Sequence, residues 1–271
     1  MVDYPDHNTE SLEAWETNAE FWDAVQGDEG NHWQRTLVFP ETLDLLQPLP
    51  ATLLEIACGN GNFARQVASL GVAVTATDGS QRLLDIAGER SEARNLTRMR
   101  LDATDRTALA AMAGARGAPF GAAVCNMAIM DIAEITPLFD MLPLSLAENA
   151  PFVFSVLHPA FNLGPDVRLF VERFETPDGR LVTESGVRIT GYLDTGVQHG
   201  IASVGQPAQQ PYFHRSLAEL FTTAFDRGWV LDGIREPSFR DRRDPDSENR
   251  LTWDDVPDIP PVLLARLRHR G

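Results

Sequence analysis

The chain has 271 residues, 43% hydrophobic and 23% charged, which is enough to bury a sizeable core in one α/β domain with additions. Its 39 acidic and 23 basic residues give a formal charge of −16, and no basic block offers the cationic surface that nucleic acids or anionic membranes require. The start of the chain has no signal-peptide pattern, and no apolar run approaches the about 18 residues that span a bilayer, so we expect a cytoplasmic protein without a nucleic-acid or membrane partner.

The cysteines and histidines predict neither a disulfide framework nor a metal site. Cys58 and Cys125 are the two thiols, and each lies in an apolar stretch that predicts a buried strand. The six histidines show none of the spacings of a zinc site. We therefore expect reduced, buried cysteines and no bound metal.

Two helices are expected before the core of the domain. Apolar residues recur near helical spacing over 11–26, which predicts an amphipathic helix, and 27–35 is expected to be a loop. A second helix is predicted over 36–46, with Pro40 at its start or at a kink. Residues 1–50 therefore form an N-terminal helical part.

Strands and helices alternate after residue 50, at the spacing of parallel strands joined by crossover helices. The predicted strands are 52–57, 72–78, 96–103, 120–129 and 151–159. The predicted helices are 62–70, 80–92 and 133–149, the last with Pro143 inside it. Because the strands are nearly continuous apolar runs, we expect a doubly wound sheet that is covered on both faces. This core occupies residues 51–159.

The pattern changes after the fifth strand. Residues 167–194 alternate apolar and polar side chains around a Pro-Asp-Gly turn, which predicts an antiparallel flap, within an insertion (160–212) over one face of the sheet. The C-terminal part of the core (213–271) is expected to return to the sheet. Its predicted elements are a helix over 216–228, a strand over 229–237, a loop over 239–260 and a last strand over 260–268.

The turn after the first strand raises the question of the ligand. Residues 59–64, GNGNFA, match G-x-G-x-x-A, so a dinucleotide-binding oxidoreductase with Asp78 on a ribose is one interpretation. However, Glu55 lies inside the buried strand, where a carboxylate needs a donor such as a free amino group. Asp102 ends the third strand at the carboxyl edge of the sheet, where it could accept from an adenine amino group. Both acids favour a different cofactor.

From Trp15 to its end, the chain resembles the class I S-adenosylmethionine-dependent methyltransferases, specifically the bacterial enzymes that act on small molecules. That family has the pattern acid-x-G-x-G-x-G after its first strand. Here Glu55, Gly59 and Gly61 match it, while Ala57 replaces a glycine. The resemblance implies a seven-stranded Rossmann-like sheet with an N-terminal helical lid.

The resemblance also implies the roles of the cofactor-binding residues. Asp78 is expected to hold both ribose hydroxyls, and Asp102 is expected to read the adenine together with the Ala103 backbone N–H. Asn126, at the end of the fourth strand, is expected near the methionyl arm. The turn formed by Ala57, Gly59 and Gly61 begins a helix, whose N-terminus attracts the methionyl carboxylate.

The residues that contact the acceptor are less sharply indicated. His158 follows the fifth strand and is the first candidate for a general base, although it could instead orient the loop. Asp131 follows the fourth strand as a second candidate base or as a capping acid. Tyr212 and His214 precede the helix that begins after Ser216, as substrate contacts or as anchors of the helix start, where Ser216 predicts a capping box.

The aromatic residues of the N-terminal part have two interpretations. By resemblance, Trp33, Phe21 and Trp22 are candidate lid residues that pack on the acceptor or on the sulfonium. Alternatively, their rings fix the helices to the core, which we favour for Trp22.

The sequence thus predicts S-adenosylmethionine-dependent methyl transfer to a small, partly apolar acceptor of secondary metabolism. O-methylation is favoured, with N-, S- and C-methylation open. Two alternatives remain: an NAD-dependent oxidoreductase, and a protein that binds S-adenosylmethionine without turnover. Oligomeric state is not indicated.

Overall fold

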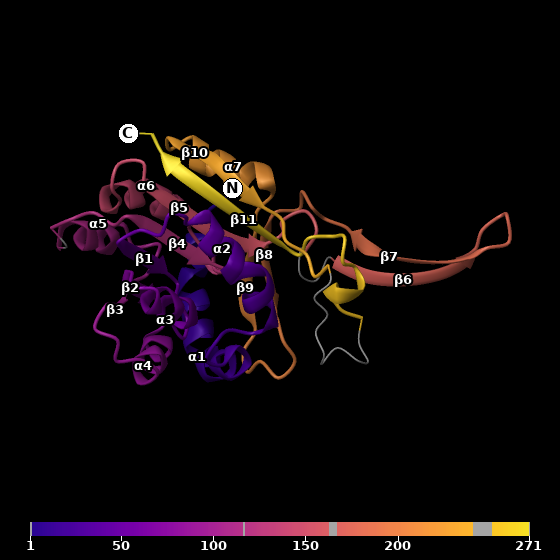
Figure 1. Ribbon diagram of the computed structural model, residues 1–271, viewed down its shortest axis with the longest axis horizontal. Helices are drawn as coiled ribbons and strands as arrows, with labels where there is room; N and C mark the ends of the chain where they lie inside the picture. The colour runs from indigo at the N-terminus through magenta and orange to yellow at the C-terminus, as the bar shows by residue number, and fades with distance from the viewer. Residues whose placement is uncertain (1, 116, 163–166, 241–250, 271) are drawn as a thin grey trace.

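The computed structural model describes residues 2–115, 117–162, 167–240 and 251–270. Its centre is a seven-stranded sheet in the order β10-β11-β5-β4-β1-β2-β3 (Figure 1). The strands that run parallel are β1 (Thr52–Ile56), β2 (Ala73–Asp78), β3 (Leu96–Arg100), β4 (Ala122–Asn126), β5 (Pro151–Leu157) and β10 (Trp229–Arg235). β11 (Val262–His269) runs antiparallel between β5 and β10. The expected seven-stranded sheet is confirmed.

Two hydrophobic cores lie on opposite faces of this sheet, as a doubly wound fold requires. The first is formed with α5 (Arg106–Ala115), α6 (Thr136–Ser145) and α7 (Leu217–Phe225). The second is formed with α2 (Phe39–Leu45), α3 (Asn62–Ser69) and α4 (Gln81–Glu89). Within the described residues, no helix has both the length and the apolar character needed to cross a membrane.

The strand order reverses at β1, which pairs with β2 on one side and with β4 on the other. In open α/β sheets, the carboxyl ends of the strands at such a reversal leave a crevice in which ligands bind. The fold therefore places the glycine turn after β1 beside the acids that end β2 and follow β3.

The N-terminal part is helical, as expected, but its second helix begins earlier than predicted. A short turn, η1 (Pro5–His7), leads into α1 (Asn8–Gln26), which packs on α4 through Ala19, Leu83 and Ile86. The predicted loop over 27–35 ends in helical structure, because a π-helical segment, η2 (Gln34–Val38), runs directly into α2. Pro40 lies in the first turn of α2, directly after the π-helical segment.

The inserted flap forms, but it does not lie over the sheet. β6 (Val167–Glu175) and β7 (Leu181–Ile189) pair as the predicted hairpin. Figure 1 shows this hairpin reaching away from the body of the molecule, and residues 171–175 are exposed. The expectation that it covers one face of the sheet is therefore wrong.

A second hairpin, which sequence reasoning missed, packs against α1 instead. It consists of β8 (Gly196–Gly200) and β9 (Gln210–His214). Asn18 of α1 exchanges two hydrogen bonds of 2.9 Å with the backbone of Ala208, in the loop between the two strands. β8 has two glycines and little apolar alternation, so its sequence gives no strand signal. Of the predicted loop over 239–260, residues 241–250 lie outside the described residues.

Candidate active site

The crevice at the carboxyl edge of the sheet has an open volume of about 940 Å³, part of it continuous with solvent. Strand ends form its floor, and α1, η2 and α2 contribute to its walls. Four acidic residues line it: Glu55, Asp78, Asp102 and Asp131. α1 contributes Asn8, Ser11, Leu12, Trp15 and Gln26. The crevice is therefore acidic, and its lining residues are far apart in the sequence.

The turn between β1 and α3 has three residues with positive φ: Ala57 at 54°, Gly59 at 58° and Gly61 at 75°. Gly59 lines the crevice, and a Cβ on it would have no neighbour closer than 3.9 Å, so a ligand can approach this backbone closely. Gly61 does not line the crevice. It is the N-cap of α3, and a Cβ there would come within 3.1 Å of Ala87, so this glycine serves helix packing.

Glu55 is the least satisfied acid of the crevice. Its side chain is 2% exposed, and its Oε2 has no hydrogen-bond partner. Burial, together with the nearby Asp78, raises the pKa of the Glu55 carboxyl to about 8. A buried oxygen of this kind is stabilised by a cationic donor. The crevice therefore presents a position that suits an ammonium group.

Asp78 is held in one orientation by the backbone. Gly59 N donates to its Oδ2 at 2.8 Å, and Ser80 N donates to its Oδ1 at 2.9 Å. Burial raises the pKa of this carboxyl to about 6, although the two N–H donors act in the opposite direction. Since each oxygen of a carboxylate can accept a second hydrogen bond, Asp78 can also accept from the two hydroxyls of a ribose.

Asp102 connects the crevice to α1. Its Oδ1 accepts from Thr104 N and Thr104 Oγ1, both at 2.8 Å. Its Oδ2 accepts from Asn8 Nδ2 at 2.8 Å. Ala103 lines the crevice beside it. The contact of Asn8 was not expected from sequence, because the predicted helix begins at residue 11 and Asn8 is 94 residues from Asp102 in the chain.

Asn126 offers a free donor at the end of β4. Its Oδ1 accepts from Thr42 Oγ1 at 3.0 Å and from Ser155 Oγ at 3.1 Å, which fixes the orientation of the amide. Its Nδ2 is buried without a hydrogen-bond partner. A buried amide that lacks an acceptor is satisfied when a ligand carboxylate or carbonyl supplies one.

Asp131 is the fourth acid of the crevice and lies in η3 (Ile129–Asp131), after β4. It is 7% exposed and accepts a hydrogen bond of 3.1 Å from Gln210 Nε2 of β9. Burial raises the pKa of its carboxyl to about 8. Tyr212, also on β9, has a buried hydroxyl without a partner, and burial and Asp131 both raise its pKa. Tyr212 itself does not line the crevice.

The structure does not bring His158 to the crevice. Its ring is 2% exposed, Nδ1 accepts from Ala160 N at 3.1 Å, and Nε2 donates to Glu236 at 2.8 Å. Burial lowers the pKa of this imidazole. These contacts correspond to the alternative in which His158 orients the loop after β5.

Two other expected substrate contacts also lie outside the residues that line the crevice. His214 Nε2 donates to the Tyr192 carbonyl oxygen at 2.8 Å. The Trp33 ring packs edge-on against Phe239 and Trp253 beside the second hydrophobic core. Both side chains therefore anchor local structure in the described part of the chain, and the capping box of Ser216 and Glu219 is confirmed at the start of α7.

Arg215 organises the loop that carries Asp131. Its guanidinium is 4% exposed and donates to the carbonyl oxygens of Val2, Ile129, Ile132 and Ala133 at 2.7–2.9 Å. Burial lowers the pKa of Arg215 to about 10, so the side chain remains charged at neutral pH. A buried cation shared by backbone carbonyls fixes the conformation of this loop.

Comparison with known proteins agrees with this geometry. Residues 53–142 match the family model of a methyltransferase domain. This segment runs from β1 through most of α6 and contains Glu55, Asp78, Asp102, Asn126 and Asp131. No curated protein sequence matches the chain.

Several solved structures share the fold over nearly the whole chain. An S-adenosylmethionine-dependent methyltransferase from Mesorhizobium loti has a TM-score of 0.66 at 18% identity, covering 90% of this chain and 100% of that chain. The glycopeptide N-methyltransferase MtfA in complex with S-adenosylmethionine has a TM-score of 0.54 at 15% identity, covering 86% of this chain and 92% of that chain. The CcbJ methyltransferase from Streptomyces caelestis has a TM-score of 0.56 at 15% identity, covering 95% of this chain and 98% of that chain.

The domain match and the shared fold agree with the family that the glycine turn and its acids indicate. The chain carries a methyltransferase domain over residues 53–142, and its seven-stranded sheet has the fold of solved S-adenosylmethionine-dependent methyltransferases.

Proposed function

We propose that the protein transfers the methyl group of S-adenosylmethionine to a small acceptor of secondary metabolism that is bound beside Asp131. The observation that carries this proposal is the buried Oε2 of Glu55, which has no partner and lies in the same crevice as the backbone-held Asp78. An amino acid joined to a nucleoside supplies both an ammonium group and two ribose hydroxyls, which are the donors that these two carboxylates need.

The remaining cofactor contacts follow from the positions of the other lining residues. Asp78 accepts from the ribose hydroxyls, and Asp102 with the Ala103 N–H binds the adenine. Glu55 receives the ammonium group, and the free amide N–H of Asn126 donates to the methionyl carboxylate. Bound S-adenosylmethionine carries a net positive charge, so it offsets the like charges of the four acids and favours their ionised forms.

The reaction is an in-line displacement. A lone pair of the acceptor attacks the methyl carbon, the carbon–sulfur bond breaks, and its electron pair returns to sulfur, which leaves neutral S-adenosylhomocysteine. The acceptor then carries the methyl group and must lose a proton. Fixing the three reacting atoms in a row supplies on the order of 7–11 kcal/mol of barrier reduction without a covalent intermediate.

Asp131 is the group that we propose takes this proton. Its carboxyl lines the crevice and is held by Gln210, whereas His158 is turned toward Glu236. A carboxylate can accept a proton from a hydroxyl or from an amine. We keep O-methylation as the first assignment. N-methylation is the second, because a protein of the same fold, MtfA, is a glycopeptide N-methyltransferase.

Calorimetry with S-adenosylhomocysteine tests the cofactor assignment. Asp78→Asn should weaken binding about 10–100-fold, since a hydrogen bond to a charged group contributes about 1.5–3 kcal/mol. Asp85→Asn is the matched control, because Asp85 is an exposed acid of α4 that does not line the crevice and accepts a hydrogen bond from Gln81 on the same helix. Its affinity should equal that of the wild type.

Turnover is tested with S-adenosylmethionine and a panel of phenols, alcohols and amines, with S-adenosylhomocysteine release measured by mass spectrometry. A methylated product from one chemical class identifies the acceptor. If the protein binds S-adenosylhomocysteine tightly but forms none from S-adenosylmethionine with any acceptor, the result would favour the alternative of a binding protein without turnover. Absence of binding would contradict the cofactor assignment itself.

A further inference from the structure

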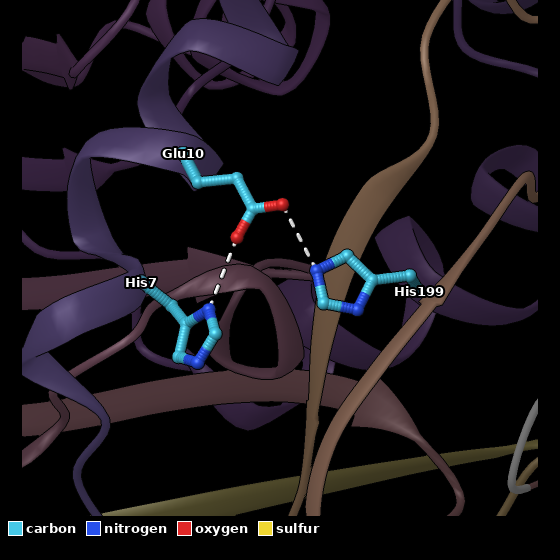
Figure 2. Close-up of side chains that lie close together, drawn as sticks. All are labelled: His7, Glu10 and His199. Carbon is cyan, nitrogen blue, oxygen red and sulfur yellow. Dashed lines mark hydrogen bonds and ion pairs between the residues drawn. The ribbon is translucent and has the colours of Figure 1, made fainter.

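Three side chains with metal-binding atoms meet at the start of α1, outside the crevice. His7 is the last residue of η1, Glu10 lies in the first turn of α1, and His199 lies on β8. Figure 2 shows both imidazole rings pointing toward the Glu10 carboxylate. Glu10 and His199 are 189 residues apart in the chain, so linear spacing predicts no such set.

The distances are close to those of a coordination sphere. His7 Nδ1 lies 3.0 Å from Glu10 Oε2, and His199 Nε2 lies 2.9 Å from Glu10 Oε1. One ligand atom from each residue can be chosen so that all three lie within 4.8 Å of one another. Tetrahedral zinc with bonds of about 2.0–2.2 Å separates its ligands by roughly 3.4 Å, so small side-chain rotations would complete the geometry.

The chemistry of the three donors also fits one class of ion. Two imidazoles and one carboxylate are a ligand set of catalytic zinc sites, in which water takes the fourth position. The side chains of His7, Glu10 and His199 are 37%, 49% and 41% exposed, so an ion and its water have access. Imidazole nitrogens select zinc and its neighbours over magnesium or calcium, which prefer oxygen ligands.

We propose that His7, Glu10 and His199 bind a zinc ion, which joins the start of α1 to the β8–β9 hairpin. Asn8, between two of the ligands, bonds Asp102 in the crevice, and Gln210 on β9 bonds Asp131. The ion therefore ties together two elements that each hold an acid of the active site. It does so outside the crevice and takes no part in methyl transfer, so this proposal is independent of the function proposed above.

Calorimetric titration of the chelator-treated full chain with zinc chloride tests the site. We expect one zinc per chain, and a rise in Tm that follows the zinc concentration. Because loss of a residue that only supports a ligand already costs about 10–100-fold in metal affinity, His199→Gln and Glu10→Gln should each weaken binding about 100-fold or more. His269→Gln is the control, since His269 packs on Trp229 and not on this cluster.

A second measurement does not depend on the variants. A crystal of the wild-type protein grown with zinc chloride should give an anomalous peak between His7, Glu10 and His199. A peak elsewhere, or zinc binding that is equal in wild type, His199→Gln and Glu10→Gln, would overturn the proposal and leave the three residues as a hydrogen-bonded tether. The far-UV circular dichroism spectrum of the metal-free variants checks that each remains folded.

Discussion

Asn8 donates a hydrogen bond of 2.8 Å to Asp102 across 94 residues of sequence, and this bond joins the first residue of α1 to an acid of the crevice. The other oxygen of Asp102 is already held by Thr104. The orientation of this carboxylate, and therefore its fit to an adenine, depends on the position of α1. The N-terminal helix thus supports the proposed cofactor site directly.

The first prediction follows from this bond. Asn8→Ala should weaken S-adenosylhomocysteine binding about three- to tenfold, because the carboxylate loses one partner with a contribution of about 1 kcal/mol. Calorimetry measures the effect, and Thr9→Ala, an exposed neighbour on the same turn, should bind as the wild type does. Tighter binding by Asn8→Ala would mean that the amide competes with adenine for Oδ2.

The second prediction concerns pH and the stability of the ligand-free protein. Glu55 has an ordinary pKa of 4.5, which folding raises to about 8, so between these values the folded state keeps a proton that the unfolded state releases. Stability should therefore fall as pH rises through this range, by up to about 1.4 kcal/mol per pH unit for this group. Glu55→Gln removes the titration.

Urea unfolding between pH 5 and pH 8 measures this difference. Glu55→Gln should gain stability relative to the wild type as pH rises. It should also bind S-adenosylhomocysteine more weakly, most of all near pH 8, where the wild-type carboxylate is ionised and the ammonium group of the ligand loses an anionic partner. Asp78 and Asp131 titrate in the same direction in both proteins, so only the difference between them is interpreted. If the free energies of unfolding of the wild type and Glu55→Gln changed in parallel with pH, Glu55 would be shown to stay ionised in the folded protein.

The third prediction tests Asp131 as the proton acceptor. Asp131→Asn should lower kcat about 10²–10⁴-fold while the affinity for S-adenosylhomocysteine stays within about twofold. In the wild type, kcat/KM should rise with pH, because the acceptor role requires the ionised carboxylate. A matching loss in His158→Gln with wild-type activity in Asp131→Asn would return the role to His158.

The fourth prediction concerns Arg215, which bonds four carbonyl oxygens from inside the protein. Arg215→Met should reduce the free energy of unfolding by about 3 kcal/mol or more, since several buried acceptors lose their donor. Arg235→Met is the comparison, because Arg235 is 42% exposed and makes surface ion pairs with Glu41 and Asp44. Its loss should cost about 1 kcal/mol or less. Equal effects would contradict the anchoring role.

The sequence by itself determined the sheet and the glycine turn. Continuous apolar runs, the spacing of turns and the acids at strand ends are local features, and local features predict where a parallel strand ends. Since the carboxyl ends of such strands meet at one edge, Glu55, Asp78 and Asp102 could be placed in a common site before any coordinates, and the family resemblance added Asn126. Helix α5 was not predicted, because the alanine-rich stretch 106–115 shows little hydrophobic periodicity.

Only the tertiary structure decided which side chains face that site. Asp131 and His158 each follow a core strand. Asp131 lines the crevice and accepts a hydrogen bond from Gln210, whereas His158 lies outside the crevice and bonds Glu236. The same holds for Asn8, which meets Asp102, and for His199, which meets Glu10. The direction of a side chain after a strand ends depends on loops packed from distant parts of the chain, and those contacts leave no signal in the neighbouring residues.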